Sequence, residues 1–130
     1  MIYAYGRGGR SEHLLELDRP VTALAAAGED LYFASGGELF LLRADRSLEL
    51  SAVLAVSGEI RSLAFDADRL VLYLVAGRSL HALVDGEVRR LADEGADAVA
   101  VHGGQLYLLD AREGRLIRLA SPPWAKRAKP

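Results

Sequence analysis

The chain has 130 residues, of which 51% are hydrophobic and 26% charged, and its formal net charge is −2. This composition fits one globular domain with a hydrophobic core, and a slightly acidic chain offers no overall field to attract nucleic acid. The absence of cysteine excludes disulfides, thiolate metal sites and cysteine nucleophiles. No apolar run approaches the roughly 20 residues that span a bilayer, and the first ten residues do not resemble a secretory signal. We therefore expect a cytoplasmic protein with neither membrane nor nucleic acid as a partner.

A ten-residue pattern recurs three times along the chain. It reads LAAAGEDLYF at residues 24–33, LAFDADRLVL at 63–72 and VAVHGGQLYL at 99–108, so that the copies begin 39 and 36 residues apart. In each copy an apolar residue is followed seven positions later by a leucine: Leu31, Leu70 and Leu106. A period in this range with strand-like content is typical of propeller blades. We expect these three leucines to be equivalent and buried.

Short apolar runs separated by Gly and Asp turns predict the strands, which we call A, B, C and D in the order they occur in each copy. The expected strands are 24–28, 31–35, 39–43 and 48–56 in the first copy, 61–65, 70–75, 80–84 and 88–91 in the second, and 98–102, 106–110 and 116–120 in the third. Ahead of the first copy, residues 13–17 are expected to form a D strand and residues 2–5 a C-type strand. Segments such as TALAAA have helical propensity, but turns every 8–12 residues favour strands.

The strand order is therefore (C)D, ABCD, ABCD, ABC, with the missing D strand at the other end of the chain. This pattern resembles the β-propeller superfamily, in which ring closure commonly mixes a strand from one terminus with three from the other. The resemblance covers Ile2 to Ala120 and rests on the repeat pattern, without a WD or kelch motif. It implies an all-β fold of about three four-stranded blades. Residues 1–120 would form a half-propeller and residues 121–130 a basic C-terminal tail.

Three blades cannot close a ring, because known propellers use roughly four to eight or more. Open blade faces and a bare strand edge would invite aggregation. We expect a homodimer in which two chains, related by a two-fold axis, form six blades, each joint blade combining A, B and C of one chain with D of the other. A nine-bladed trimer and a partner protein supplying the missing half remain alternatives. In the joint blade two C-type strands, residues 2–5 and 116–120, compete for one place, so one of them would form a fifth strand or an arm.

The residue types that carry catalysis or bind metals do not occur at the required spacing. His13, His81 and His102 do not show metal-ligand spacing, and no serine lies in a Gly-x-Ser-x-Gly setting. The acidic segments 66–68 and 28–30 lack the further ligands of a calcium loop, so we interpret them as turns capped by Asp. We expect no catalytic residue, no metal and no cofactor. Residues 7–10 are interpreted as a glycine hairpin, and Trp124 in the basic tail as part of a solvated terminus.

In a propeller the D–A and B–C loops share the face around the mouth of the central channel. The resemblance therefore places seven polar residues at this mouth: Arg19, Thr22, Glu59, Arg61, Arg78, Asp97 and Arg112. Thr22, Arg61 and Asp97 begin the A strands and would lie nearest the axis. Two interpretations remain open, a polar binding site on the axis or a set of ion pairs that neutralise one another.

Loops on a rigid frame commonly carry binding sites. The sequence therefore favours a non-catalytic binding or scaffold module that recognises a protein or small ligand at the channel mouth. A propeller-type hydrolase or lactonase with an axial metal is an alternative, with Glu59 and Asp97 as carboxylates, although the chain has no asparagine. An accessory subunit of a larger complex is a third possibility, and fold alone does not choose among them.

Overall fold

The computed structural model describes residues 2–5, 11–15, 20–53, 58–92 and 95–119, and within these ranges it contains thirteen strands and no helix. The first pair consists of β1 (Ile2–Tyr5) and β2 (Ser11–Leu15). Blade 1 consists of β3 (Ala23–Ala27), β4 (Asp30–Ser35), β5 (Glu38–Leu42) and β6 (Leu48–Val53). Blade 2 consists of β7 (Ile60–Asp66), β8 (Val71–Ala76), β9 (Ser79–Val84) and β10 (Glu87–Ala92). Blade 3 consists of β11 (Ala98–His102), β12 (Gln105–Asp110) and β13 (Arg115–Leu119).

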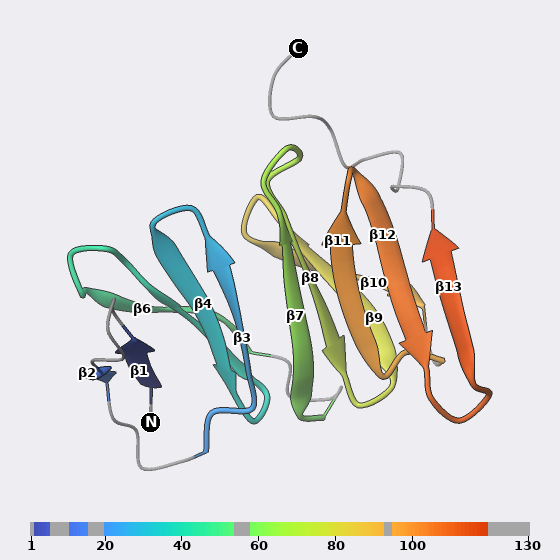
Figure 1. The fold of residues 1–130 in the computed structure, drawn as a ribbon, viewed down its shortest axis with the longest axis horizontal. Coiled ribbons are helices and arrows are strands. Elements are labelled where there is room, and N and C mark those ends of the chain that lie inside the picture. Colours follow the sequence, from blue (N-terminus) through green and yellow to red (C-terminus); the bar gives the residue numbers. More distant parts are fainter. Residues whose placement is uncertain (1, 6–10, 16–19, 54–57, 93–94, 120–130) are drawn as a thin grey trace.

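Each blade is an antiparallel meander whose strands pair in chain order. The three blades stand side by side, and the first strand of blade 2, β7, packs between β3 and β11 (Figure 1). This is the arrangement of propeller blades around a channel. Glycine allows the tightest hairpins: the β11–β12 turn uses Gly103 and Gly104, both at positive φ, a conformation open to residues without a Cβ.

The predicted strands agree with the observed ones, but the β7–β8 hairpin has a longer turn than its counterparts. Its closing pair is Asp66–Val71, which leaves four residues in the turn, whereas the β3–β4 and β11–β12 hairpins have two. Leu70 therefore lies in the turn at φ 56° and is 62% exposed. The expectation that Leu70 is a buried B-strand residue is wrong.

The residue equivalent to Leu31 and Leu106 is Leu72, because these three stand one pair beyond the hairpin-closing pair of each blade. Leu106 is 2% exposed and Leu72 1%, while Leu31 is partly buried. The seven-residue spacing thus identifies the correct position in the first and third blades only. The expected capping of this turn by aspartate is observed, because Asp66 accepts hydrogen bonds from the backbone N–H groups of Asp68 and Arg69.

Two of the three buried hydrophobic clusters of the described residues lie between blades, and the third, which contains Phe33 and Leu42, lies in blade 1. One cluster fills the interface of blades 1 and 2 and contains Leu39, Ile60 and Leu74, and the other fills the interface of blades 2 and 3 and contains Tyr73 and Leu80. Blade 2 is covered on both sides, so every residue of β8 is buried. This explains why the sequence of β8 is a continuous apolar run rather than an alternating one.

The outer faces of blades 1 and 3 both carry exposed leucines, although Phe33, which pairs with Leu24 on the outer face of blade 1, is fully buried. Ala23 and Ala25 pack toward blade 2, so strand alternation turns Leu24 to the opposite face, where it is 56% exposed. On blade 3, Val99 and Leu108 pack toward blade 2, and Leu109 and Leu116 face outward. A monomer therefore exposes leucine side chains at both ends of the blade row.

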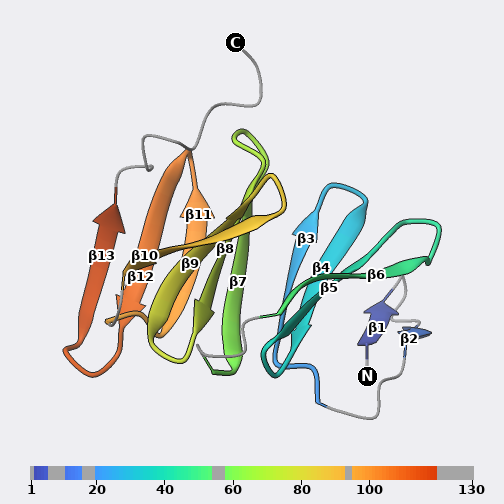
Figure 2. The ribbon, with the colours of Figure 1, turned by 180° about the vertical axis from the view of Figure 1, so that it is seen from behind.

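The N-terminal strands β1 and β2 form an antiparallel pair, with Tyr5 opposite Ser11. They lie at the blade 1 end of the molecule, and β13 lies at the other end (Figure 1 and Figure 2). Within the described residues, neither β2 nor β13 pairs with a second strand. The described part of the chain also holds no helix long and apolar enough to cross a membrane. Residues 6–10 and the tail 121–130, which the sequence analysis interpreted, lie outside the described residues.

Candidate functional site

Backbone hydrogen bonds join the B–C turns of blades 1 and 2 to the segments that begin blades 2 and 3, and one of these bonds lies within blade 2 itself. The Ile60 N–H donates to the carbonyl of Gly36, the Gly77 N–H to that of Glu59, and the Ala96 N–H to that of Arg78 (2.7, 2.9 and 3.2 Å). The loops that the sequence analysis assigned to one face thus lie together. We call this the loop face.

Arg78 and Asp97, both predicted at the loop face, form an ion pair between blades 2 and 3. The Nε of Arg78 donates to Oδ1 of Asp97 at 3.3 Å and its Nη2 to Oδ2 at 3.2 Å. The same Nη2 donates to Oδ1 of Asp110 at 2.7 Å. The hydrogen bonds from Arg78 and from the Ala111 N–H hold the pKa of Asp97 below its ordinary value. Asp97 is therefore held by Arg78 and the backbone of blade 3, and not by Arg61.

Asp110, which the sequence analysis did not single out, is the most buried member of this cluster. Burial raises its pKa, but hydrogen bonds from Arg115, from the Glu113 N–H and from Arg78 outweigh that effect and leave the pKa lowered. Asp110 ends its B strand at the position that Ser35 and Ala76 occupy in the other blades. An aspartate where the sister blades carry Ser and Ala was the signal in the sequence.

Thr22, Arg61 and Asp97 do hold equivalent positions where the innermost strands begin. The Thr22 hydroxyl donates to the carbonyl of Ile60 at 2.6 Å, which uses this side chain to join blades 1 and 2. Arg61 lies where the register of β7 shifts, is exposed, and makes no hydrogen bond or ion pair with the described residues. The structure thus brings Asp97 to Arg78 rather than to Arg61.

The remaining predicted site residues occupy the edge of the loop face. Glu59 and Arg112 are exposed, and the charge of Arg112 also lowers the pKa of Asp97. Arg19 lies outside the described residues. Among the residues that are described, no three His, Cys, Asp or Glu side chains gather closely enough to hold a metal ion.

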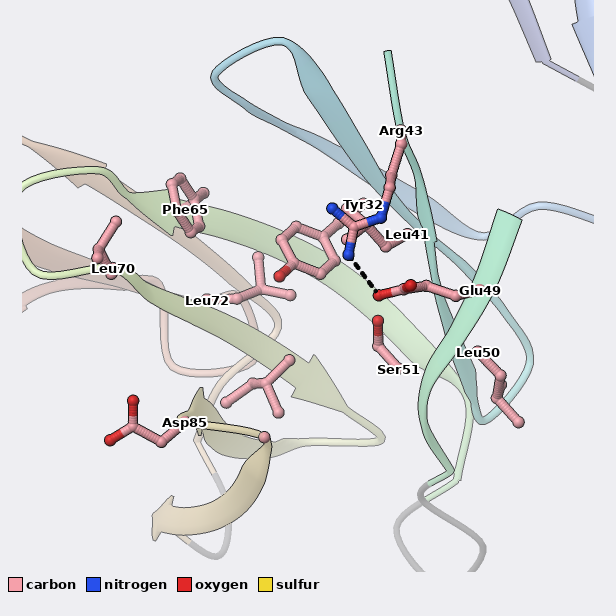
Figure 3. Close-up of a pocket in the computed structure, with 12 residues that line it drawn as sticks. Tyr32, Leu41, Arg43, Glu49, Leu50, Ser51, Phe65, Leu70, Leu72 and Asp85 are labelled. Atoms are coloured by element: carbon pink, nitrogen blue, oxygen red, sulfur yellow. Dashed lines mark hydrogen bonds and ion pairs between the residues drawn. The ribbon is translucent and has the colours of Figure 1, made fainter. Parts of the chain in front are cut away.

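A pocket of about 360 Å³ opens between blades 1 and 2 at the opposite ends of the strands from the loop face. We call it the blade 1–2 pocket. Its walls come from β4 to β6 of blade 1 and from β7 to β9 of blade 2 with the A–B and C–D turns of that blade (Figure 3). The residues that line it are Tyr32, Leu41, Arg43, Glu49, Leu50, Ser51, Phe65, Leu70, Leu72, Leu83, Asp85 and Gly86.

The inner wall of the pocket is apolar and aromatic. The ring of Tyr32 lies between Phe65 and an ion pair of Arg43 with Glu49 (Figure 3), and the two ring centroids are 6.1 Å apart. Burial, together with the negative charge of Glu49, raises the pKa of the Tyr32 hydroxyl, which is therefore a neutral donor at physiological pH. Leu72 contributes a further apolar side chain to this wall.

Charges at the rim of the pocket are unequally compensated. Nη2 of Arg43 donates to Oε1 of Glu49 at 3.0 Å, so these two charges neutralise each other. Asp85, in the C–D turn of blade 2, makes no hydrogen bond or ion pair with the described residues. The rim therefore carries one unneutralised carboxylate. The pocket has no signal in the sequence, because its residues come from two blades and each of them fits the pattern of a strand core or a turn.

Neither a family model nor a curated protein matches the sequence, but solved structures resemble the fold. A crystal structure of a nidogen/laminin complex matches with TM-score 0.75 and 16% identity over 93% of this chain and 51% of that one. A streptogramin B lyase structure matches with a TM-score of 0.68 and 15% identity, over 95% of this chain and 48% of that one. The structure of virginiamycin B lyase from Staphylococcus aureus matches with a TM-score of 0.66 and 11% identity, over 96% of this chain and 50% of that one. The chain spans about half the length of each, and these likenesses confirm the predicted β-propeller fold.

Proposed function

We propose that this protein is a non-catalytic binding module that takes a segment of a partner protein into the blade 1–2 pocket. The observation that carries this proposal is the pocket itself: an apolar wall with two aromatic rings and an unneutralised carboxylate at the rim. Concave sites with apolar walls and a few polar groups are where proteins bind ligands. The pocket is framed by strands and turns of two packed blades, which hold its shape.

The chemistry of the pocket selects an apolar side chain next to a basic one. Leu70, with the partly exposed rings of Tyr32 and Phe65, provides an apolar surface for an aliphatic or aromatic side chain, and the buried Leu72 lies behind it. Asp85 attracts a Lys or Arg on the same segment, since Arg43 is already neutralised by Glu49. An apolar–basic dipeptide would satisfy both features.

Leu70 supports the proposal through its backbone. Its φ of 56° lies in the left-handed region, where a non-glycine residue costs on the order of 1–3 kcal/mol. Glycine would relieve that cost, yet the chain places a large apolar side chain there and exposes it. A strained and exposed leucine beside a pocket is expected where recognition outweighs stability.

A displayed random hexapeptide library selected on the purified protein tests this proposal. We expect enriched peptides to carry an apolar residue adjacent to Lys or Arg, and synthetic versions to lose at least tenfold in affinity with Leu70→Ser and with Asp85→Ala. Val53→Ser is the matched control, because Val53 is also exposed but does not line the pocket. A selection in which no enriched peptide carries an apolar residue next to Lys or Arg, or in which neither pocket variant weakens the binding of such peptides, would contradict the proposal.

The channel mouth is a second candidate binding place, favoured by Arg61. This guanidinium is exposed on the central blade and without a partner among the described side chains, whereas the equivalent Thr22 and Asp97 are engaged. An acidic peptide group is the ligand that such an arginine would take. In the same library, acidic peptides that lose affinity with Arg61→Ala but not with Arg89→Ala, an exposed arginine of β10, would identify this second place.

The enzymatic alternative lacks a supporting geometry in the described residues. A hydrolase or lactonase with an axial metal would use carboxylates at the channel mouth, but Asp97 is bound by Arg78 and the Ala111 N–H. An accessory subunit of a larger complex is compatible with protein binding at the blade 1–2 pocket and differs only in the number of partners.

A further inference from the structure

We propose that the β1–β2 pair of one copy completes blade 3 of a second copy, in the strand order β11–β12–β13–β2–β1. Two copies exchanging this pair would close a six-bladed ring. The inference concerns assembly and is independent of the ligand proposed for the blade 1–2 pocket.

The position of β2 in the chain identifies it as a D strand. Seven residues separate β2 from the A strand β3, and six and five separate the D strands β6 and β10 from the A strands that follow them. Blades 1 and 2 have four strands, whereas blade 3 has three within the described residues. The N-terminal D strand and the incomplete blade are therefore complementary parts.

Strand direction decides which member of the pair adjoins blade 3. All neighbouring strands within the blades are antiparallel, so a D strand runs opposite to the C strand beside it. If β2 runs as a D strand, it is antiparallel to β13, and β1, which is antiparallel to β2, would be parallel to β13. Placing β2 against β13 keeps the sheet antiparallel and leaves β1 as a fifth, outermost strand. The competition between two C-type strands, left open by the sequence, is thereby removed.

The two free edges cannot meet within one chain. Within the described ranges β2 and β13 are each paired on one edge only, and the figures place them at opposite ends of the molecule (Figure 1 and Figure 2). An unpaired edge is a template for a strand from another chain. A second copy carries the same two unpaired edges, so a two-fold axis would pair each β2 with the β13 of the other copy.

The exposed leucines on the outer faces of blades 1 and 3 indicate the same partner. Leu24 is exposed on the outer face of blade 1, and Leu116, 74% exposed, on that of blade 3. In a closed ring each of these faces would pack against its neighbour as the inner faces already do.

The absence of cysteine permits a direct test by disulfide cross-linking. Arg118→Cys in β13 is combined with Glu12→Cys, His13→Cys or Leu14→Cys in β2, which covers three registers of the proposed strand pair. We expect at least one combination to give a covalent dimer after mild oxidation, and equimolar mixtures of the corresponding single variants to give it as well. Arg118→Cys with Arg89→Cys is the control, because β10 lies outside the proposed joint blade.

Light scattering of the cysteine-free protein gives the stoichiometry. The proposal requires a mass of twice 14.0 kDa at micromolar concentration. A monomer, a trimer, open polymers, or a dimer in which none of the three combinations cross-links would each overturn it. Recovery of the protein only with a different chain bound to β13 would overturn it as well, in favour of a partner that supplies the other half.

Discussion

The register of the second repeat can be tested by comparing Leu72→Ala with Leu70→Ala. The two leucines stand two positions apart and the substitution is the same, but Leu72 is 1% exposed and Leu70 is 62% exposed. If the four-residue turn is correct, only the first substitution removes a core side chain.

The expected cost follows from the surroundings of Leu72. A buried Leu→Ala change costs about 2–5 kcal/mol, and less where the cavity can collapse or fill with water. Leu72 belongs to the cluster between blades 1 and 2 but also lines the blade 1–2 pocket, so part of the vacated space adjoins solvent. We therefore expect about 2–3 kcal/mol, the lower part of the range, and a melting temperature lower by roughly 10 °C.

For Leu70→Ala we expect a change within about 0.5 kcal/mol, as for exposed positions in general. Both variants are measured by urea unfolding followed by circular dichroism, at one fixed protein concentration because assembly would couple to unfolding. A loss of 2 kcal/mol or more for Leu70→Ala, or a neutral Leu72→Ala, would refute the register and restore the seven-residue spacing in blade 2.

Three further predictions concern buried polar groups. Tyr73→Phe should raise the free energy of unfolding by about 1 kcal/mol in urea unfolding, because the buried Tyr73 hydroxyl has no partner among the described residues; a loss of stability would reveal a hidden partner. Burial and the nearby charge of Arg90 lower the pKa of His81 from its ordinary value of 6.5. The free energy of unfolding should therefore be highest above about pH 6.5. As the pH falls from there to the pKa of His81 in the folded protein, it should decrease by up to about 1.4 kcal/mol per pH unit. His81→Leu should remove this dependence in unfolding curves measured from pH 5 to 8. Arg78→Ala should lower the melting temperature more than Arg43→Ala. The loss of Arg78 leaves the buried carboxylate of Asp110 with fewer hydrogen-bond donors, whereas the loss of Arg43 leaves Glu49, which water can solvate. Equal decreases in melting temperature would contradict this difference.

Much of the architecture follows from the local order of apolar runs and turn residues. Each hairpin turn lies between strands that are adjacent in the chain, so Gly36 with Gly37, and Gly103 with Gly104, indicate meanders without any knowledge of the rest of the fold. The continuous apolar run of β8 indicates a strand covered on both faces. The D–A and B–C loops could be assigned to one face because alternating strand directions require it.

The site could be predicted only in part, since side chains choose partners across blades. Arg78 and Asp97 were placed at the loop face from the sequence, but their ion pair and its third member, Asp110, depend on the rotation of blade 3 against blade 2. The blade 1–2 pocket depends in the same way on how blade 2 meets blade 1.

The sequence by itself determined the strands, their order and the incomplete set of blades, because hairpins and repeats are local properties of the chain. The tertiary structure decided the length of the β7–β8 turn, the exposure of Leu70, the partner of Asp97 and the pairing of β1 with β2. A turn of two or of four residues leaves the apolar pattern almost unchanged, and only the pairing register shows which leucine is buried. Hydrogen bonds between blades join residues 18 to 38 positions apart, and no local pattern encodes the angle at which two sheets pack.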